Sequence, residues 1–110
     1  MTVKISNHSI NSYTWQNWHI FRPERLNALG TTIAKELADT LEFARDQLAP
    51  EVRAVVITAE TVVKSGLAYW VAGGDLKELS TLDQKHQAHI YAQTMRRFCE
   101  GLETLPVPVI

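Results

Sequence analysis

The sequence contains a single cysteine, Cys99, and almost no excess of charge of either sign. One cysteine cannot form a disulfide within the chain, which fits a reducing, intracellular setting. The formal net charge of the 110 residues is -1. That balance gives no electrostatic reason to expect nucleic acid or an anionic membrane as a partner.

Long apolar runs are missing as well. No uninterrupted stretch approaches the roughly 20 apolar residues that cross a bilayer. The first ten residues, MTVKISNHSI, lack the apolar segment of a secretory signal. We therefore expect a cytoplasmic protein without a membrane partner. With 45% hydrophobic and 21% charged residues, the composition favours one small globular domain over a disordered chain.

The order of the predicted elements indicates an α/β fold. We expect strands over residues 1–10 and 13–21, joined by a turn at Asn11-Ser12 and ended by Pro23, which cannot donate to a strand ladder. A helix is predicted from about Thr32 to Leu48, with Thr31 or Thr32 as its cap. Its apolar residues recur at steps of three and four: Ile33, Leu37, Leu41, Ala44 and Leu48.

The second half of the chain repeats this order. VRAVVIT, residues 52–58, is short and nearly all apolar, which is typical of a strand buried on both faces. We expect an irregular stretch over residues 59–69 and a second helix from Asp83 to about Leu102. The apolar stripe of that helix consists of Tyr91, Met95, Phe98 and Leu102. Cys99 lies one residue from this stripe and is interpreted as a packed thiol.

The last residues, LPVPVI, resemble the beginning of a buried strand. Termini usually lie exposed at the surface, so we expect residues 1–110 to be the N-terminal part of a larger domain, truncated within a strand. The alternative is a short edge strand that ends there.

Two adjacent glycines, Gly73 and Gly74, stand between an apolar approach and a helical start in the stretch WVAGGDLKEL. Without a Cβ, this backbone can adopt unusual dihedral angles and approach a ligand closely. The Gly74 N–H could stabilise an oxygen on which negative charge develops, which would be half of an oxyanion hole. Most glycines before helices only form turns, and neither GxGxxG nor GxxxxGK[ST] is present to bind a phosphate.

Three segments, in this order, resemble the enoyl-CoA hydratase/isomerase family, the crotonase superfamily. They are RPERLNAL (residues 22–29), VRAVVIT followed by WVAGGDLKEL (52–58 and 70–79), and LPVPVI (105–110). The resemblance implies a partial crotonase-like spiral of β-β-α units. It also implies a coenzyme A thioester of fatty acid metabolism as substrate, no separate cofactor, no metal, and a possible trimeric homo-oligomer.

Site residues follow from the same resemblance. Gly74 matches the position that gives the first oxyanion-hole N–H, which stabilises a thioester enolate. The surrounding positions that match the acyl-CoA site are Ala72, Gly73, Asp75 and Leu76, and the positions near the adenine and pantetheine of the coenzyme are Arg25 and Ala28. The second N–H donor and the usual catalytic carboxylates of the family match nothing in this chain. Glu60 and Glu78 match no catalytic position and are assigned no role.

Other functions remain open at this point. The chain could be a catalytically incomplete fragment or a non-catalytic assembly module, because one N–H without its partner forfeits much of the stabilisation. A small nucleotide-binding α/β domain is a third possibility, although no phosphate motif supports it. His86 and His89, three apart on the second helix, lack the further ligands that a closed metal site needs. The reaction within the superfamily is not fixed by these residues.

Overall fold

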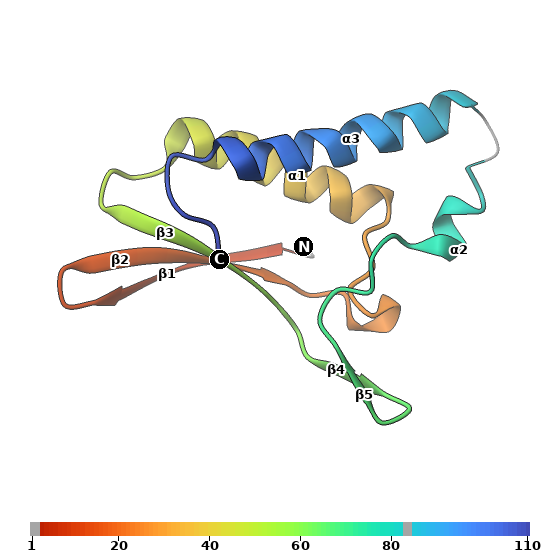
Figure 1. Ribbon diagram of the computed structural model, residues 1–110, viewed down its shortest axis with the longest axis horizontal. Helices are drawn as coiled ribbons and strands as arrows, with labels where there is room; N and C mark the ends of the chain where they lie inside the picture. The colour runs from red at the N-terminus through yellow and green to blue at the C-terminus, as the bar shows by residue number, and fades with distance from the viewer. Residues whose placement is uncertain (1–2, 83–84) are drawn as a thin grey trace.

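The computed structural model describes residues 3–82 and 85–110, apart from the side chain of Leu76. Strands and helices come in groups along the chain (Figure 1). In order, they are β1 (Val3–Ile10), β2 (Tyr13–Ile20), the short 3-10 helix η1 (Pro23–Arg25), α1 (Thr31–Gln47), β3 (Val52–Ala59), β4 (Val62–Lys64), β5 (Leu67–Tyr69), α2 (Leu76–Leu79) and α3 (Lys85–Thr104).

β1, β2 and β3 form one sheet in that order. β1 and β2 are an antiparallel hairpin, and its turn lies at Asn11-Ser12, as the sequence predicts. β2 and β3 run parallel, with α1 as the crossover between them. Two parallel strands need such a crossover, so the predicted strand–helix–strand order is confirmed as an α/β unit.

A second unit repeats the pattern through α3. After that helix, the chain returns to the free edge of β3, where Val55 N–H donates to the Pro108 carbonyl at 2.9 Å and Ile110 N–H donates to the Val55 carbonyl at 2.9 Å. Val55 and Val109 form a parallel bridge. The extended run expected at the end of the sequence therefore pairs as a strand does.

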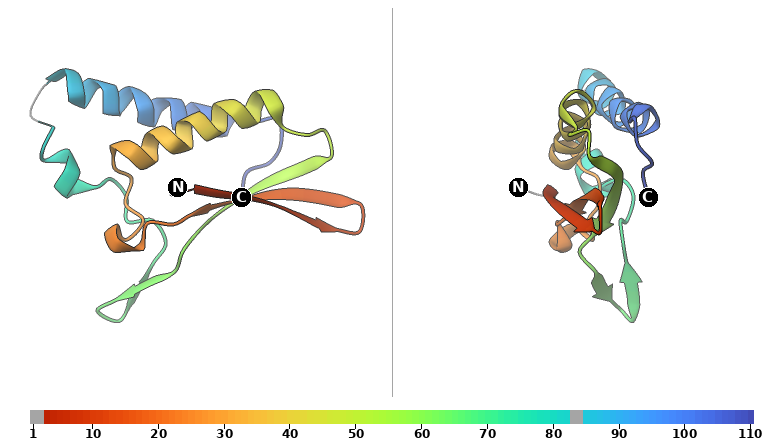
Figure 2. Two further views of the ribbon diagram at one scale, coloured as in Figure 1. Left: turned by 180° about the vertical axis from the view of Figure 1, so that it is seen from behind. Right: turned by 90° about the vertical axis from the view of Figure 1, so that its left-hand side faces the viewer.

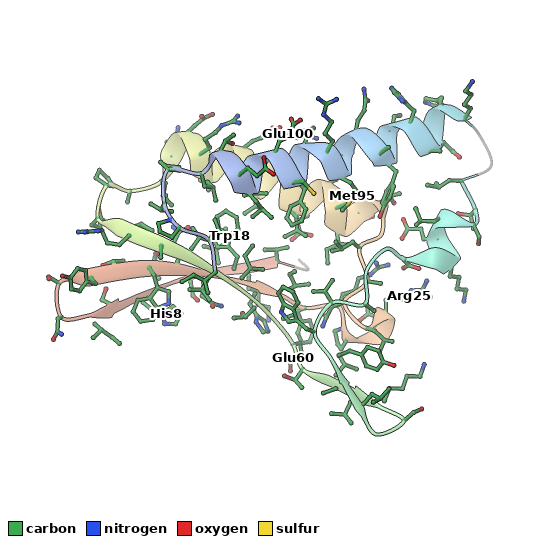
Figure 3. The ribbon with its side chains drawn as sticks, in the orientation of Figure 1. His8, Trp18, Arg25, Glu60, Met95 and Glu100 are labelled. Atoms are coloured by element: carbon green, nitrogen blue, oxygen red, sulfur yellow. The ribbon has the colours of Figure 1, made fainter. Side chains whose placement is uncertain are left out.

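Helices α1 and α3 lie side by side over one face of this sheet (Figures 1 and 2). Side chains alternate across a strand, so Trp18 and Ile20 of β2 point toward the helices. Trp18 is fully buried there (Figure 3), and its indole N–H donates to Gln16 Oε1 at 3.0 Å. The predicted stripe of α1 fills the other half of the core, with Ile33, Leu37 and Leu41 each at most 1% exposed.

A hairpin replaces the irregular stretch expected over residues 59–69. β4 and β5 pair antiparallel through a two-residue turn, Ser65-Gly66, in which both residues have positive φ (53° and 77°). Such a turn suits the twist of two short strands. The expectation was wrong because the β-forming residues on either side of Ser65-Gly66 were not recognised as a pair. The hairpin projects away from the sheet and the helices (Figure 1).

Two smaller expectations also fail. The N-cap of α1 is Gly30, and neither Thr31 nor Thr32 caps the helix with its side chain. Cys99 is exposed on α3 rather than packed, so its position one residue from the apolar stripe does not bury it. The predicted start of the second helix at Asp83 lies outside the described residues, and α3 is described from Lys85.

Polar contacts close the outer side of the two-helix layer. Arg97 of α3 donates to Glu42 Oε1 at 2.8 Å and to Asp39 Oδ1 at 3.1 Å, both on α1. α3 is therefore amphipathic, with charged groups along one side. In the described part of the chain, no helix has both the length and the apolar character that a membrane span requires.

Truncating the core on α1 should destabilise the fold. Leu37 is 0% exposed, whereas Phe43 on the same helix is 68% exposed. Leu37→Ala should lower the free energy of unfolding by about 2–5 kcal/mol, because it leaves a cavity in a packed interior. Phe43→Ala should change it by no more than about 0.5 kcal/mol. Urea denaturation of the two variants checks the comparison, and equal losses would contradict this core.

Candidate functional site

Two segments far apart in sequence pair beside the ends of β2 and β3. Leu29 N–H donates to the Gly73 carbonyl at 2.7 Å, Asp75 N–H donates to the Leu29 carbonyl at 3.3 Å, and Ala72 N–H donates to the Leu26 carbonyl at 3.2 Å. Leu29 and Gly74 thus form a parallel bridge. The segment after β2 and the glycine pair are held together as short strands.

This pairing sets the direction of the Gly74 N–H. The Gly73 carbonyl and the Gly74 N–H belong to one planar trans peptide, so they point in opposite directions. Because the Gly73 carbonyl is bound by Leu29, the Gly74 N–H points away from the Leu29 segment. Among the residues that the structure describes, none accepts a hydrogen bond from it. Gly74 is an exposed residue.

The two glycines differ in what the backbone requires. Gly73 has a φ of 85°, a left-handed conformation that residues with a Cβ rarely adopt. Gly74 does not have a positive φ, and a Cβ there would lie 3.2 Å from Leu79 Cδ1 and 3.7 Å from the Tyr91 hydroxyl. Gly73 is therefore fixed by conformation, whereas the missing Cβ at Gly74 leaves room for the side chain of Leu79.

One buried side chain, Asn27, joins three backbone segments around this pair. Its Oδ1 accepts from Arg22 N–H at 2.8 Å. Its Nδ2 donates to the carbonyls of Glu60 at 2.8 Å and Trp70 at 2.9 Å. Glu60 and Trp70 flank the β4–β5 hairpin, so a single amide holds both ends of it. Asn27 is 0% exposed and has a left-handed φ of 56°, which asparagine tolerates better than most residues.

Asp75 lies at the centre of a charged cluster. Its carboxylate is only 3% exposed and accepts from both Nε (3.0 Å) and Nη2 of Arg25, a bidentate pairing. Arg22 Nη1 lies 3.3 Å from Asp75 Oδ2. The hydrogen bonds from Arg25, above all, lower the pKa of Asp75 from 3.8 to about 2. Asp75 is therefore ionised at neutral pH and ties the glycine segment to η1.

The same stretch joins the first turns of α1 and α2. Asp75 Oδ1 accepts from Glu78 N–H at 3.2 Å, as the N-cap residue of α2 does. Glu78 in turn accepts from both the N–H (2.8 Å) and the hydroxyl of Thr31 in the first turn of α1, where a negative charge is favourable. The Thr31 hydroxyl is the main reason that the pKa of Glu78 is lowered. A Cβ on Gly30 would collide with this carboxylate, so the cap of α1 needs glycine for space.

The structure thus brings the seven sequence-predicted site residues close together. Arg25 contacts Asp75, Ala28 is buried beside the paired segments, and Ala72 and Gly73 are exposed. Leu76 begins α2. The guanidinium of Arg25, which lies at η1 (Figure 3), forms an ion pair with Asp75. A contact of these residues with coenzyme A stays a prediction.

Several residues of the site were missed from the sequence. Arg22, Asn27 and Glu78 hold the segment after β2, the glycine pair and the first turn of α1 together, and these contacts are here called the frame. No role was assigned to the three residues from the sequence. Two signals were available. The stretch Asp75-Leu76-Lys77-Glu78 has the spacing of a capping box, with Glu78 three residues after the N-cap. The polar Asn27 in the otherwise apolar LNAL indicates a side chain that serves the backbone.

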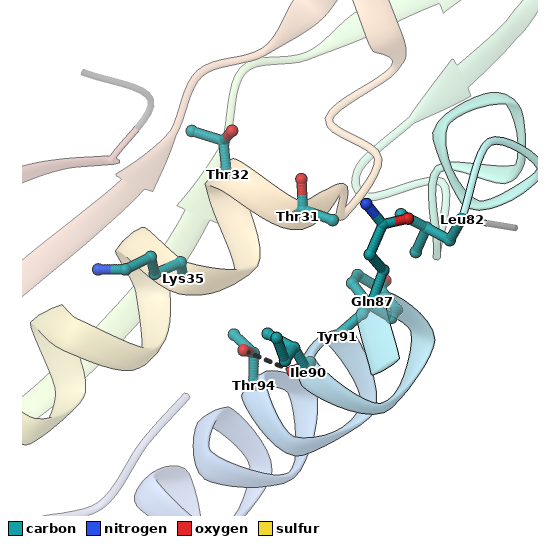
Figure 4. A pocket seen from close by; sticks show the side chains of 8 residues that line it. All are labelled: Thr31, Thr32, Lys35, Leu82, Gln87, Ile90, Tyr91 and Thr94. Atoms are coloured by element: carbon teal, nitrogen blue, oxygen red, sulfur yellow. Dashed lines mark hydrogen bonds between the residues drawn. The ribbon is translucent and has the colours of Figure 1, made fainter. Parts of the chain in front are cut away.

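Two cavities flank the paired segments. One, of about 420 Å³, lies between the first turns of α1 and α3 (Figure 4). It is lined by Thr31, Thr32, Lys35, Leu82, Gln87, Ile90, Tyr91 and Thr94. The other, of about 210 Å³, is apolar and includes Trp70 and Val71 in its lining. Within residues 3–82 and 85–110, no three His, Cys, Asp or Glu side chains gather as metal ligands, and His86 and His89 lie exposed on α3.

The low pKa of Asp75 predicts an acid-labile contribution to stability. Between about pH 4 and pH 2 the unfolded chain binds a proton at Asp75 that the folded protein does not. Stability from this group is therefore present above pH 4 and is lost as the pH falls through that window. Urea unfolding from pH 2 to pH 6 should show a shallower acid loss for Asp75→Asn than for the wild type. Parallel pH profiles would contradict the pairing.

Asn27 should be among the most sensitive polar positions. Asn27→Ala should destabilise the fold by about 2–4 kcal/mol, because it removes three part-buried hydrogen bonds that each contribute about 0.5–1.5 kcal/mol. Asn27→Gly accepts the left-handed backbone without strain, so it isolates the loss of the hydrogen bonds from the conformational cost. Thermal and urea denaturation measure both variants. A loss below about 1 kcal/mol for Asn27→Gly would show that the amide is not the clamp.

Comparisons with known proteins agree on one relationship. The family model described as enoyl-CoA hydratase/isomerase matches residues 17–110. An enoyl-CoA hydratase from Bacillus anthracis is 22% identical with a TM-score of 0.77, and the match covers 99% of this chain and 38% of that one. A structure from Mycobacterium smegmatis, also titled enoyl-CoA hydratase, is 24% identical with a TM-score of 0.73, covering 96% and 37%.

An enoyl-CoA hydratase/isomerase from Pseudoalteromonas atlantica is 24% identical with a TM-score of 0.64, covering 100% of this chain and 37% of its own. The chain therefore spans less than two fifths of the length of these structures. Curated proteins give no match. The family model covers most of the chain, and the structures show that the α/β units form part of a crotonase-like fold. The chain belongs to the enoyl-CoA hydratase/isomerase family.

Proposed function

We propose that this protein binds an acyl-CoA thioester and that the Gly74 N–H donates to the thioester oxygen, as one of two backbone donors that stabilise an enolate. The observation that carries the proposal is the direction of this N–H. It is exposed, it points away from its own frame, and Leu29 fixes the peptide that contains it. Family membership supplies the substrate class.

The chemistry follows from where charge develops. Removing a proton from the carbon next to the thioester carbonyl moves negative charge onto the carbonyl oxygen. A fixed N–H directed at that oxygen stabilises the charged state more than the neutral thioester, so it lowers the barrier. A donor held by a rigid frame also needs little reorganisation when the charge appears.

The neighbouring charges support a role for the backbone rather than for a cation. Arg22 and Arg25 lie close to the site, but Asp75 and Glu78 neutralise them. The positive charges of Arg22 and Arg25 are therefore paired with carboxylates of the protein itself. On this proposal, Arg25 and Asp75 position the segment, and the coenzyme lies beside the two stretches that contain Ala28, Ala72, Gly73 and Leu76.

The remaining proposals concern the whole protein. We propose an enzyme of the hydratase or isomerase type, in which further residues supply the second N–H and the catalytic acid and base. The coenzyme is part of the substrate, so no separate cofactor is needed. A cytoplasmic location and a homo-oligomer of the trimeric type complete the proposal.

Removing the Gly74 donor tests the function directly. Gly74→Pro deletes the N–H, whereas Gly74→Ala keeps it and places a Cβ 3.2 Å from the flexible end of Leu79 and 3.7 Å from the Tyr91 hydroxyl. With crotonyl-CoA as substrate, Gly74→Pro should lower kcat/KM by about 100- to 1,000-fold, the usual cost of one lost oxyanion donor. Gly74→Ala should stay within about threefold of the wild type, since its donor is intact.

Binding of free coenzyme A should be the same in both variants, and circular dichroism checks that each is folded. Full activity in Gly74→Pro would exclude Gly74 as the donor. A wild-type protein that neither binds nor turns over short- and long-chain enoyl-CoAs would contradict the proposed function itself.

A further inference from the structure

Tyr91 joins α3 to the segment that faces Gly74. Its hydroxyl donates to the Leu29 carbonyl at 2.6 Å. The sequence places Tyr91 in the apolar stripe of α3, but the ring is only half-buried, and it also lines the 420 Å³ cavity (Figure 4). The hydroxyl lies 3.7 Å from the position that a Cβ on Gly74 would take, so it is close to the site itself.

The Leu29 peptide groups have three partners that together fix them. The Leu29 carbonyl accepts from the Tyr91 hydroxyl at 2.6 Å and from Asp75 N–H at 3.3 Å, while Leu29 N–H donates to the Gly73 carbonyl at 2.7 Å. A carbonyl oxygen has two lone pairs, so both donors can be satisfied. The bond to Tyr91 is the shorter of the two and comes from a long helix rather than from the glycine segment.

The phenol is held in its donor form. Burial, followed by the negative charges of Glu78 and Asp75, raises the pKa of Tyr91 above its usual value of 10.0. Arg22 pairs with both carboxylates, and Arg25 pairs with Asp75. Tyr91 therefore donates to Leu29 throughout the neutral pH range.

We propose that Tyr91 is a positioning residue for the thioester site, which by fixing the Leu29 carbonyl sets the direction of the Gly74 N–H. The chain of contacts is short: the Tyr91 hydroxyl holds Leu29, and Leu29 holds the Gly73 carbonyl, whose peptide carries the Gly74 N–H. This inference rests on the proposed function. It adds a residue from α3 to a site otherwise built from the segments after β2 and β5.

The test measures polarisation of the bound thioester. Butyryl-CoA labelled with ¹³C at its carbonyl is saturated and can be followed by NMR when bound to the protein. An aligned N–H should move this resonance downfield from its position in water. The variant is Tyr91→Phe, which removes only the hydroxyl. The matched control is Tyr13→Phe on β2, an exposed tyrosine whose ring lies under Arg53.

Wild type and Tyr13→Phe should show the same downfield shift, and Tyr91→Phe a smaller one at a similar dissociation constant. With crotonyl-CoA, Tyr91→Phe should lower kcat about tenfold with little change in KM, a smaller loss than the roughly 100-fold that a 1 Å misplacement costs. A residue with only a structural role would instead lower the fraction of folded protein and leave the bound carbonyl unchanged.

Each other outcome decides between the proposals. If wild type gives a shift and Tyr91→Phe gives an equal one with equal kcat, the role of Tyr91 is refuted and the function stands. If butyryl-CoA binds the wild type with no shift, or does not bind, the proposed function fails whatever Tyr91 does. If Tyr91→Phe does not fold, the second experiment uses wild-type protein labelled with 3-fluorotyrosine, whose hydroxyl is a stronger hydrogen-bond donor. The ¹³C resonance of bound butyryl-CoA should then move further downfield, and no further movement overturns the proposal.

Discussion

The side-chain amide of Asn27 is the contact on which the site depends. It has two donors and one acceptor in use, and they reach three places that the sheet alone would leave apart: the end of β2, the start of the β4–β5 hairpin and the approach to the glycine pair. A buried amide that loses its hydrogen-bond partners is costly, so the three segments stay together once the Asn27 side chain is in place. The hairpin can then project outward while its base remains fixed.

The charged cluster extends this frame to the helices. Asp75 caps α2 and binds Arg25, while Glu78 caps α1 through Thr31. Each carboxylate thus serves a helix end and an arginine at once. The arrangement explains how an exposed glycine segment is held firmly without being buried. The glycine segment is held by contacts with Leu29, Asp75 and Asn27, while Gly74 itself remains exposed.

The periodicity of apolar residues was sufficient to predict the sheet and helix layers, but not the polar contacts of the frame. The stripe of α1 and the apolar run of β3 were predicted because their packing is local in sequence and regular. The hairpin was missed because Ser65-Gly66 was not recognised as a turn between two short strands. For Asn27 and Glu78, local signals were available, but the partners that give them their role lie more than 30 residues away, and single-sequence patterns do not identify such partners. Gly74 was predicted as a site residue because the family motif marks it, and this role stays a prediction.

The Gly74 N–H is proposed as the donor that meets the thioester oxygen. The most direct measurement is the amide ¹H–¹⁵N resonance of Gly74 during titration with butyryl-CoA and, separately, with coenzyme A alone. We expect a downfield amide proton shift at Gly74 with the thioester and no such shift with the free coenzyme. A Gly74 resonance that stays in place while neighbouring amides move would contradict it.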